Sequence, residues 1–399
     1  MSHRSRRQAI HPISEALGRI MNRKLIWLIL LVAALAVVFW PSRREAPAPQ
    51  PQQTAVRPAV RPIGAPVEIK APLGLPAVPI PADNPPTAAT IALGRRLYYD
   101  PVLSVDNTVS CASCHDPRFG FSDGKPVSEG VGRKKGTRNA PTVFNAAYYS
   151  VQFWDGRAPS LEKQAEGPVQ NPVEMVHTLE GCVKRLEADP SYKQAFEEAF
   201  GPGPITFDMV GKAIASFERT VISGDSPFDR YFYGGQKNAL SASARRGLEV
   251  FRDPAKGNCA VCHTIGEKDA LFSDDKFHNI GVGVKDGQPT DLGRYEVTKR
   301  DADRGAFKTP SLRNVALTAP YFHDGSRKTL KEVIDFYIGG GNSNPYLDKE
   351  VKVLDFLTGQ ERADLLAFLE SLTGTMPADV GPPETAKKAE GKPRGTPED

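Results

Sequence analysis

Two copies of one short motif constrain this chain more than any other feature of its sequence. The segment CASCH at residues 111–115 returns as CAVCH at residues 259–263. Cys-x-x-Cys-His is typical of covalent haem c attachment, in which two thioethers hold the porphyrin and the histidine is an axial ligand of the iron. The motifs predict two haem c groups, attached through Cys111, Cys114, His115, Cys259, Cys262 and His263.

Two other interpretations of paired cysteines fit less well. A zinc ribbon would set its Cys-x-x-Cys pairs about 15 to 20 residues apart. A thioredoxin-like motif would lie in an alternating strand and helix pattern, which the sequence does not show. Neither explains the histidine that follows both second cysteines. The one remaining cysteine, Cys182, is expected to be a lone buried thiol.

The N-terminus has the charge pattern of a membrane anchor. Residues 25–40 form a run of sixteen apolar residues. The segment before them, residues 1–24, is basic and contains a single acidic residue, Glu15. Positive charge before an apolar run orients that end toward the cytoplasm. Because the run is shorter than the roughly 20 residues of a spanning helix, a cleaved signal peptide is the alternative. We expect a single-pass anchor in the inner membrane with the body on the periplasmic side, or a soluble periplasmic protein after cleavage.

Composition separates a folded body from its flanks. Residues 41–88 are rich in proline and lack aromatic residues, which predicts an extended tether. Residues 376–399 are highly charged, which predicts a disordered tail. The net charge of +4 over 399 residues gives no indication of a nucleic-acid partner.

The body between these flanks contains an internal repeat. LGRRLYYDP (93–101) precedes the first haem motif, and ARRGLEVFRDP (244–254) precedes the second. The segment APTVFNAA…FWDGRAPSLEKQ (140–164) is echoed by TPSLRNVA…YFHDGSRKTLKEV (309–333). A duplicated unit with haem near its start is the simplest account of these similarities.

Periodicity predicts that this unit is helical. Apolar residues recur at spacings of three and four over 205–222, and Thr358 and Glu361 form a capping box before another such run. No sustained alternation predicts a sheet. The expected fold class is all-α, with two cytochrome c-like haem domains at 89–235 and 236–375.

The second axial position of each iron decides whether a haem passes electrons or binds a substrate. When Gly156 is aligned with Gly325, the twelfth residue onward is Pro168 in the first repeat and Tyr337 in the second. A phenolate can ligate ferric iron, whereas proline has no donor atom. The alignment predicts a six-coordinate second haem and a first haem with an open face. The alternatives are an ordinary helix residue for Tyr337 and an ordinary loop residue for Pro168.

Together these segments resemble the bacterial di-haem cytochrome c peroxidase family, including its MauG branch. The resemblance covers about residues 89–375 and rests on both haem motifs, RNAPTVFNAAY, FWDGR, QNPVEM, FHNIGV, TPSLRNVALTAPYFHDGS and IDFYIGGG. It implies that the N-terminal haem reacts with hydrogen peroxide and that the C-terminal haem handles electrons.

The resemblance also implies roles for single residues. Glu174 matches the distal acid-base carboxylate, and Gln164 matches the distal amide. Pro168 matches the residue packed over the open face, and Trp154 matches the aromatic residue between the haems.

One calcium ion between the domains is implied as well. Its ligands would be Asn139 and the backbone carbonyls of Thr318 and Pro320. Oxygen ligands of this kind are those that the hard calcium ion prefers.

The chain departs from many family peroxidases in two places. Those proteins close the resting peroxidatic haem with a histidine after the first motif, but residues 122–139 contain none. The site is therefore expected to be ready without reductive activation. Typical peroxidases have methionine where this chain has Tyr337, whereas MauG-like members have tyrosine. An anionic oxygen ligand should lower the haem potential relative to methionine.

The predicted function is that of an enzyme that reduces hydrogen peroxide to water with electrons from a small periplasmic c-type cytochrome. The first alternative is MauG-type oxidation or maturation of a tyrosine or tryptophan in a partner protein, also driven by peroxide. The second, from another class of protein, is a membrane-tethered electron-transfer cytochrome whose two irons are both six-coordinate. The sequence does not identify the electron donor.

Overall fold

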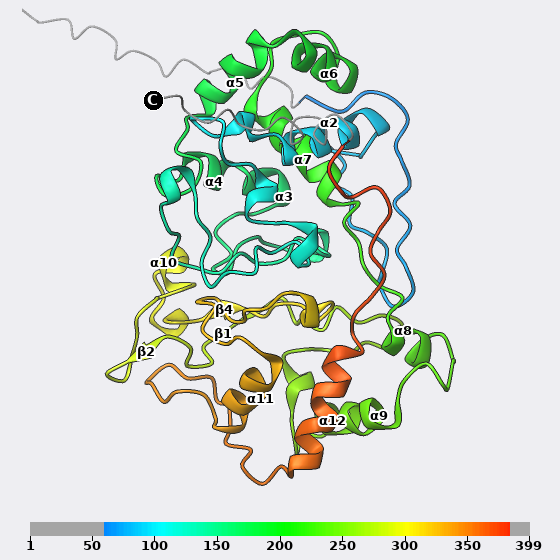
Figure 1. Ribbon diagram of the computed structural model, residues 1–399, viewed down its shortest axis with the longest axis vertical. Helices are drawn as coiled ribbons and strands as arrows, with labels where there is room; N and C mark the ends of the chain where they lie inside the picture. The colour runs from blue at the N-terminus through cyan, green and yellow to red at the C-terminus, as the bar shows by residue number, and fades with distance from the viewer. Residues whose placement is uncertain (1–59, 384–399) are drawn as a thin grey trace, which may run out of the picture. The chain divides into compact units, whose positions relative to one another are not determined.

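Each half of the chain is built on two crossing helices (Figure 1). The computed structural model describes residues 60–383. In the first half α2 (Ala88–Tyr99) packs against α7 (Phe207–Glu218), and in the second half α9 (Ala242–Arg252) packs against α12 (Gly359–Glu370). Both α2 and α9 also contact the turn that carries the haem motif of their own half. The repeat in the sequence is therefore a repeated helix pair next to a haem motif.

A glycine lets the helices of each pair approach closely. A Cβ added to Gly94 of α2 would lie 1.8 Å from the carbonyl oxygen of Ala213, and one added to Gly247 of α9 would lie 2.0 Å from that of Asp364. Only a residue without a side chain fits at such a crossing.

Polar side chains cap the N-termini of these helices. Thr87 and Thr206 accept backbone N–H bonds at the starts of α2 and α7. The capping box predicted for α12 is confirmed, because the Glu361 N–H donates to Thr358 Oγ1 at 3.2 Å and the Thr358 N–H donates to the Glu361 carboxylate at 2.9 Å. Each such cap stabilises a helix by about 1 kcal/mol.

The other helices have between four and eleven residues. The first half adds α3 (Leu161–Gln164), α4 (Glu166–Gln170), α5 (Leu179–Ala188) and α6 (Pro190–Phe200). The second half adds α8 (Pro227–Phe232), α10 (Tyr295–Thr298) and α11 (Leu330–Ile338).

The prediction of an all-α chain is too simple. The described residues are 37% helical, and four two-residue strands occur in the second half. β1 (Phe277–His278) pairs antiparallel with β4 (Phe307–Lys308), and β2 (Val284–Lys285) pairs antiparallel with β3 (Gln288–Pro289). Strands of two residues leave no alternating pattern in a sequence, so periodicity misses them.

The prediction of an extended tether that takes no part in the core is wrong for residues 60–87, which pack against both halves (Figure 1, blue). Lys212 of α7 donates to a carbonyl at the start of this segment at 2.7 Å. In the second half the Ala270 N–H donates to the Gly74 carbonyl at 3.0 Å, and Leu75 is buried in the core. Prolines keep this backbone extended, but its carbonyls and apolar side chains still find partners.

The prediction of a disordered tail from residue 376 is also wrong for residues 376–383. This segment runs from α12 back to the first half (Figure 1, red). There the Tyr99 hydroxyl donates to the Val380 carbonyl at 2.6 Å, and Arg95 donates to the Gly381 carbonyl at 2.6 Å. The high charge that predicts disorder belongs to the residues beyond this stretch.

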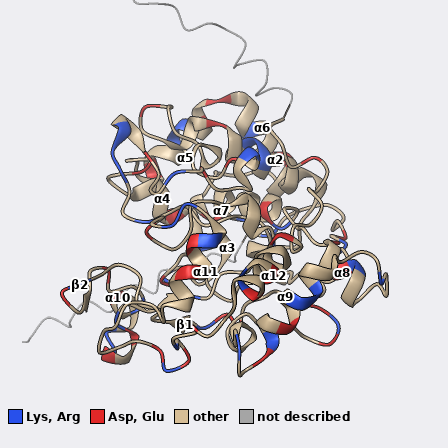
Figure 2. Ribbon diagram, turned by 60° about the horizontal axis from the view of Figure 1, so that its bottom comes forward, with Lys and Arg blue, Asp and Glu red and all other residues tan. Residues whose placement is uncertain are grey.

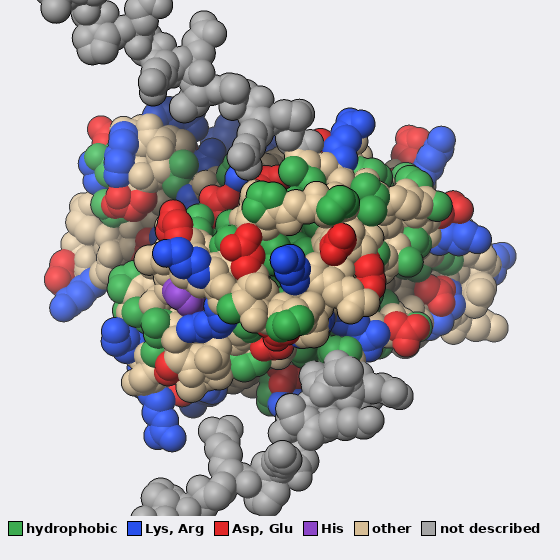
Figure 3. Space-filling model, turned by 90° about the horizontal axis from the view of Figure 1, so that it is seen from above, with side chains coloured by type: hydrophobic (Ala, Val, Ile, Leu, Met, Phe, Trp, Pro, Cys, Tyr) green, Lys and Arg blue, Asp and Glu red, His purple; other side chains and the backbone are tan. Residues whose placement is uncertain are grey.

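The predicted basic segment and anchor, residues 1–24 and 25–40, lie outside the described residues. Among residues 60–383 no helix is both long enough and apolar enough to span a membrane. Along the described backbone the positions of Lys and Arg are interspersed with those of Asp and Glu (Figure 2). Figure 3 shows hydrophobic side chains lying among them on the face seen from above.

Candidate functional site

The first haem motif presents a histidine that is oriented by its surroundings. Nδ1 of His115 lies 3.3 Å from the Phe121 carbonyl oxygen, so the N–H of this nitrogen donates and Nε2 keeps its lone pair for a metal. Burial lowers the pKa of His115, which keeps the ring neutral. The Tyr98 hydroxyl fixes the same residue by donating to the His115 carbonyl at 2.7 Å.

The second motif repeats this arrangement. Nδ1 of His263 lies 2.8 Å from the Phe272 carbonyl oxygen, and burial lowers the pKa of His263. Phe121 and Phe272 are both fully buried and both have positive φ, 59° and 53°. Each histidine is thus ready to ligate iron through Nε2.

The cysteines of the motifs suit thioethers rather than thiolate ligands. Burial raises the pKa of Cys114 to about 11 and that of Cys259 to about 12, and it raises the pKa of Cys111 further. Neutral thiols of this kind are poor metal ligands. The residues present therefore fit two covalently attached haems.

A cavity of about 480 Å³ lies beside the first motif. Residues far apart in the sequence meet in its wall, and those predicted from the sequence are Cys111, Cys114, His115, Asn139, Trp154, Gln164, Pro168 and Glu174. All four residues with an implied catalytic role therefore face one space with the haem attachment site. This volume is in the usual range of about 300 to 1,000 Å³ for a ligand pocket.

Glu174 is held in the cavity wall by a local turn. Nδ2 of Asn171 donates to Glu174 Oε1 at 2.6 Å, and Asn171 Oδ1 accepts from the Val173 N–H at 3.1 Å. Burial raises the pKa of Glu174, while Arg157 and Asn171 oppose that shift. A carboxyl with increased proton affinity suits proton transfer at neutral pH. Sequence analysis missed Asn171, although an Asn-Pro turn is visible at this position.

The loop without a histidine, residues 122–139, supports Glu174 from behind. The Val131 N–H donates to the Glu174 carbonyl at 2.8 Å. A Cβ on Gly130 would lie 2.3 Å from the Val173 carbonyl oxygen. The loop thus packs directly on the backbone that carries the carboxylate.

Trp154 lies where the first half of the chain contacts the second. Its Nε1 donates to the Asn139 carbonyl at 2.9 Å, and its ring is 6.5 Å from the ring of His323. His323 stacks on Phe307 at 3.6 Å, and burial lowers the pKa of His323 to about 4. His323 is therefore a neutral packing residue between Phe307 and Trp154.

An ion-pair cluster that sequence analysis missed joins the halves beside Trp154. Arg138 binds Asp155 of the first half at 2.6 Å and Asp291 of the second half at 2.7 Å. These carboxylates raise the pKa of Arg138 against the opposing effect of burial. The partners are far apart in the sequence, so no local pattern could have indicated the pair.

The backbone supports the alignment of the two repeats around Gly156 and Gly325. Phe153 and Phe322 both have φ of 70°, and the antiparallel bridge from Gln152 to Ala158 is matched by one from Tyr321 to Arg327. Each of these residues has the same separation from its counterpart as Gly156 has from Gly325. Counted on from this matched stretch, Pro168 of α4 aligns with Tyr337 of α11, and their equivalence stays a prediction.

Tyr337 lies on α11 beside the second haem motif. Burial raises the pKa of its phenol, and the thiols of Cys259 and Cys262 act in the same direction. Its ring packs edge-on against Phe322, with centroids 6.2 Å apart. Tyr337 therefore lies near the second haem motif, whereas Pro168 lines the cavity beside the first.

A possible metal cluster near the second motif belongs to the haem site. Ligand atoms of Cys262, Asp274 and His278 lie within 4.8 Å of one another. Cys262 is a haem attachment residue, which removes it as a thiolate ligand. The two ring nitrogens of His278 are engaged by Asp348 at 2.6 Å and Asp274 at 3.0 Å.

The structure leaves the predicted calcium site untested. Asn139 donates through Nδ2 to the Lys125 carbonyl at 2.8 Å and through its backbone N–H to the His323 carbonyl at 2.7 Å. Thr318 and Pro320 lie in the loop before α11. Calcium binding by these residues stays a prediction.

The interpretation of Cys182 as a lone buried thiol is confirmed. The residue is fully buried on α5, and Sγ donates to the Leu103 carbonyl at 3.4 Å. Burial raises the pKa of Cys182 to about 11, so this thiol is unreactive.

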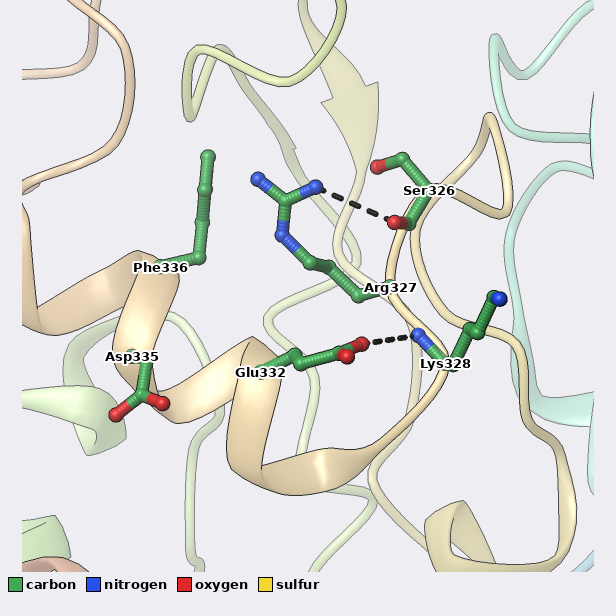
Figure 4. Close-up of a pocket in the computed structure, with 6 residues that line it drawn as sticks. All are labelled: Ser326, Arg327, Lys328, Glu332, Asp335 and Phe336. Carbon is green, nitrogen blue, oxygen red and sulfur yellow. Dashed lines mark hydrogen bonds between the residues drawn. The ribbon is translucent and has the colours of Figure 1, made fainter.

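A second cavity, of about 530 Å³, lies on α11 (Figure 4). Its lining residues are Ser326, Arg327, Lys328, Glu332, Asp335 and Phe336. The polar groups in it bind one another, since Glu332 accepts from the Lys328 N–H at 2.5 Å and Arg327 donates to the Ser326 carbonyl at 3.3 Å. We therefore attribute this cavity to the packing around α11 and not to a functional site.

Fold and motifs together define a di-haem c-type protein, in which each half carries a Cys-x-x-Cys-His motif whose histidine is oriented by a backbone carbonyl. Residues 88–238 match the family described as di-haem cytochrome c peroxidase, and residues 244–373 match cytochrome c.

Relatives place the chain within that class. The methylamine utilization protein MauG of Methylorubrum extorquens is 43% identical over 296 residues, which are 74% of this chain and 81% of that protein. Cytochrome-c peroxidase IdrP1 of a Pseudomonas species is 38% identical over 385 residues, 89% of this chain and 94% of that protein. A solved MauG-like protein associated with microbial copper homeostasis has a TM-score of 0.69 at 36% identity, covering 76% of this chain and 94% of its own.

The chain belongs to the di-haem cytochrome c peroxidase family, which includes the MauG proteins. It consists of two cytochrome c-like domains and carries two c-type haems.

Proposed function

We propose that this protein is an enzyme that reduces hydrogen peroxide to water at the first haem. Electrons come from a periplasmic donor such as a small c-type cytochrome and pass through the second haem. The observation that carries this proposal is the inequality of two aligned positions, Pro168 in the cavity of the first haem and Tyr337 beside the second. Relatives named cytochrome-c peroxidase support it.

The residues of the first cavity divide the work of the reaction. The haem supplies an iron that binds peroxide and accepts electrons when it is in place. With peroxide in the cavity, the Glu174 carboxylate would take a proton from one peroxide oxygen and return it to the other, which would leave as water. Gln164 would donate a hydrogen bond to the peroxide, and Pro168 offers no ligand atom at its place in the cavity wall. Two electrons and two protons complete the reduction of one peroxide to two waters.

Trp154 is proposed to carry electrons between the haems. Its ring lies where the two halves meet, fixed at Nε1 by the Asn139 carbonyl and flanked by His323. Arg138 holds the two halves together next to it. We further propose that the protein works on the periplasmic side of the inner membrane, anchored by residues 25–40, with calcium at Asn139.

A second candidate function is peroxide-dependent oxidation of tyrosine or tryptophan in a partner protein. The similarity to MauG and the tyrosine at position 337 favour it. Steady-state turnover of peroxide with reduced cytochrome c distinguishes the two. Rapid turnover supports the peroxidase, whereas reaction with peroxide but without turnover of the cytochrome supports the second candidate. A protein inert to peroxide contradicts both and leaves an electron-transfer cytochrome.

Tyr337→Phe is expected to change the low-spin signal of the second haem and to leave the first haem unaltered, because only the second position holds a phenol. Electron paramagnetic resonance of the ferric protein measures both centres. Tyr346→Phe, in the loop after α11, is the control and should change neither signal. An unchanged spectrum of Tyr337→Phe removes this residue as a ligand.

Gly130→Ala is expected to slow the reaction with peroxide at least several-fold, because a Cβ there meets the backbone of residues 173 and 174 at 2.3 to 2.5 Å. Gly136→Ala in the same loop is the matched control, since its nearest neighbour would be 3.6 Å away. Stopped-flow mixing with peroxide gives both rates. Equal rates for the two variants contradict the role of this loop as a support for Glu174.

A further inference from the structure

Glu218 is a buried carboxyl group that the proposed reaction does not use. It is the last residue of α7, its exposed fraction is 6%, and it lines the cavity of the first haem. Within residues 60–383 its carboxyl forms no hydrogen bond or ion pair. A carboxyl buried without a partner is costly unless it is neutral or interacts with a group bound in the cavity.

The titratable and charged groups around Glu218 come from several elements. Arg219 follows it on the chain but is bound at 2.7 Å by Glu162 of α3. Tyr98 of α2 and Cys111 of the first motif also interact electrostatically with it. Burial raises the pKa of Glu218 to about 8, with Arg219 opposing and Glu162 reinforcing the shift. Cys111 and Glu218 line the same cavity, so a haem attached through Cys111 would face this carboxyl.

The second half shows that the fold does not need a carboxyl at this place. Phe217 and Phe368 are equivalent, since each packs its ring against an aromatic residue of the crossing helix with centroids 5.1 and 5.0 Å apart. The next residues are Glu218 in α7 and Leu369 in α12. Leu369 is 7% exposed in an apolar core. Of these two matching positions, only the one in the half with the first haem motif therefore carries a carboxyl.

We propose that Glu218 binds a proton when the first haem is reduced and releases it when that haem is oxidised. One electron from the donor enters the ferric haem, and one proton from solvent binds the Glu218 carboxylate. The net charge of the buried site then stays constant. Reduction removes a positive charge next to the carboxyl and so favours its protonated form, and by linkage protonation favours reduction.

The inference rests on haem attachment at Cys111 and not on the reaction with peroxide. A negative result here therefore leaves the proposed peroxidase function standing, and a protein inert to peroxide leaves this inference standing. Its readout is a potential, which is measured without turnover.

Spectroelectrochemical titration at pH values on both sides of the carboxyl pKa of about 8 tests the proposal in the holoprotein. In the wild type the equilibrium constant for reduction of the first haem should decrease by up to tenfold for each unit of increase in pH. This corresponds to a decrease in potential of about 59 mV for one electron. Glu218→Gln and Glu218→Leu should flatten this dependence. The second haem should behave alike in all three proteins. A first haem whose dependence is flat in the wild type, or equally steep in both variants, overturns the proposal.

Redox-difference infrared spectroscopy gives a second readout that needs only one variant with haem attached. The wild type should gain the C=O band of a carboxylic acid on reduction, and Glu218→Gln should lack it. Glu218→Leu introduces the residue that the second half has at this position. This variant replaces Glu218→Gln in the test if Glu218→Gln fails to take up haem. A wild type without the band contradicts proton uptake by a carboxyl.

Discussion

Glu174→Gln is expected to slow the reaction with hydrogen peroxide by about 10²- to 10⁴-fold, the usual contribution of a positioned acid-base group. Glutamine keeps the shape and the hydrogen-bonding capacity of the side chain but cannot accept and return a proton. Asn171 can still bind its carbonyl oxygen, as it binds Oε1 of Glu174 at 2.6 Å now. The haem spectra should therefore stay as in the wild type, and only the reaction should change.

A carboxylate outside the cavity wall is the control for this substitution. Glu166 lies on α4, close in sequence, but its carboxylate binds Lys163 at 2.8 Å. Glu166→Gln should react with peroxide at the wild-type rate. Stopped-flow absorbance after mixing with peroxide gives the rates of all three proteins. A wild-type rate in Glu174→Gln would refute proton transfer by this carboxyl.

Arg313→Ala is expected to lower the free energy of unfolding by about 3 to 5 kcal/mol, as for other broken buried ion pairs. Arg313 is 1% exposed and binds Asp229, which is fully buried, at 2.8 Å. It also donates to the carbonyls of Ala270 and Gly74. The substitution leaves the Asp229 charge buried without its partner. It also removes one of the two hydrogen bonds through which the second half holds the Gly74 carbonyl, the other coming from the Ala270 N–H.

The matched control for this prediction is an exposed ion pair of the same half. Lys331 binds Asp335 at 2.7 Å on α11, but its side chain is 75% exposed. Lys331→Ala should change stability by no more than about 0.5 kcal/mol. Denaturant unfolding of the holoproteins measures both effects. A decrease in the free energy of unfolding below about 1 kcal/mol in Arg313→Ala would show that the pair of Arg313 and Asp229 does not hold residues 60–87 against the second half.

Local and repeated features of the site could be predicted from the sequence. The haem motifs fix Cys111 and His115 by spacing alone, and the internal repeat relates Pro168 to Tyr337 without any structure. Glu174 required the family resemblance, because a carboxylate in a loop has no pattern of its own. Each of these residues is identified by neighbours that are near it in the sequence or in the equivalent repeat.

Contacts between distant segments could not be predicted in this way. Arg138 binds Asp291 of the other half. Arg313 binds Asp229 and the Gly74 carbonyl, although no periodicity relates these positions. The proline-rich segment illustrates the same limit. Its composition excludes regular structure, but composition does not say whether extended backbone packs on the body.

Glu218 could have been noticed in the sequence, although it was not. It lies four residues after Ile214 in an apolar helical run, on the face that meets the cavity. A charged residue on the apolar stripe of a helix is a visible anomaly. Its meaning depends on the cavity, because only there does the carboxyl lie beside the attachment site of haem.

Electron paramagnetic resonance of the fully ferric holoprotein tests the central claim most directly. The account predicts one high-spin centre, at the haem of His115 facing Pro168, and one low-spin centre, at the haem of His263 and Tyr337. Added peroxide should abolish the high-spin signal first. Two low-spin signals, both indifferent to peroxide, would contradict the open first haem and with it the proposed peroxidase.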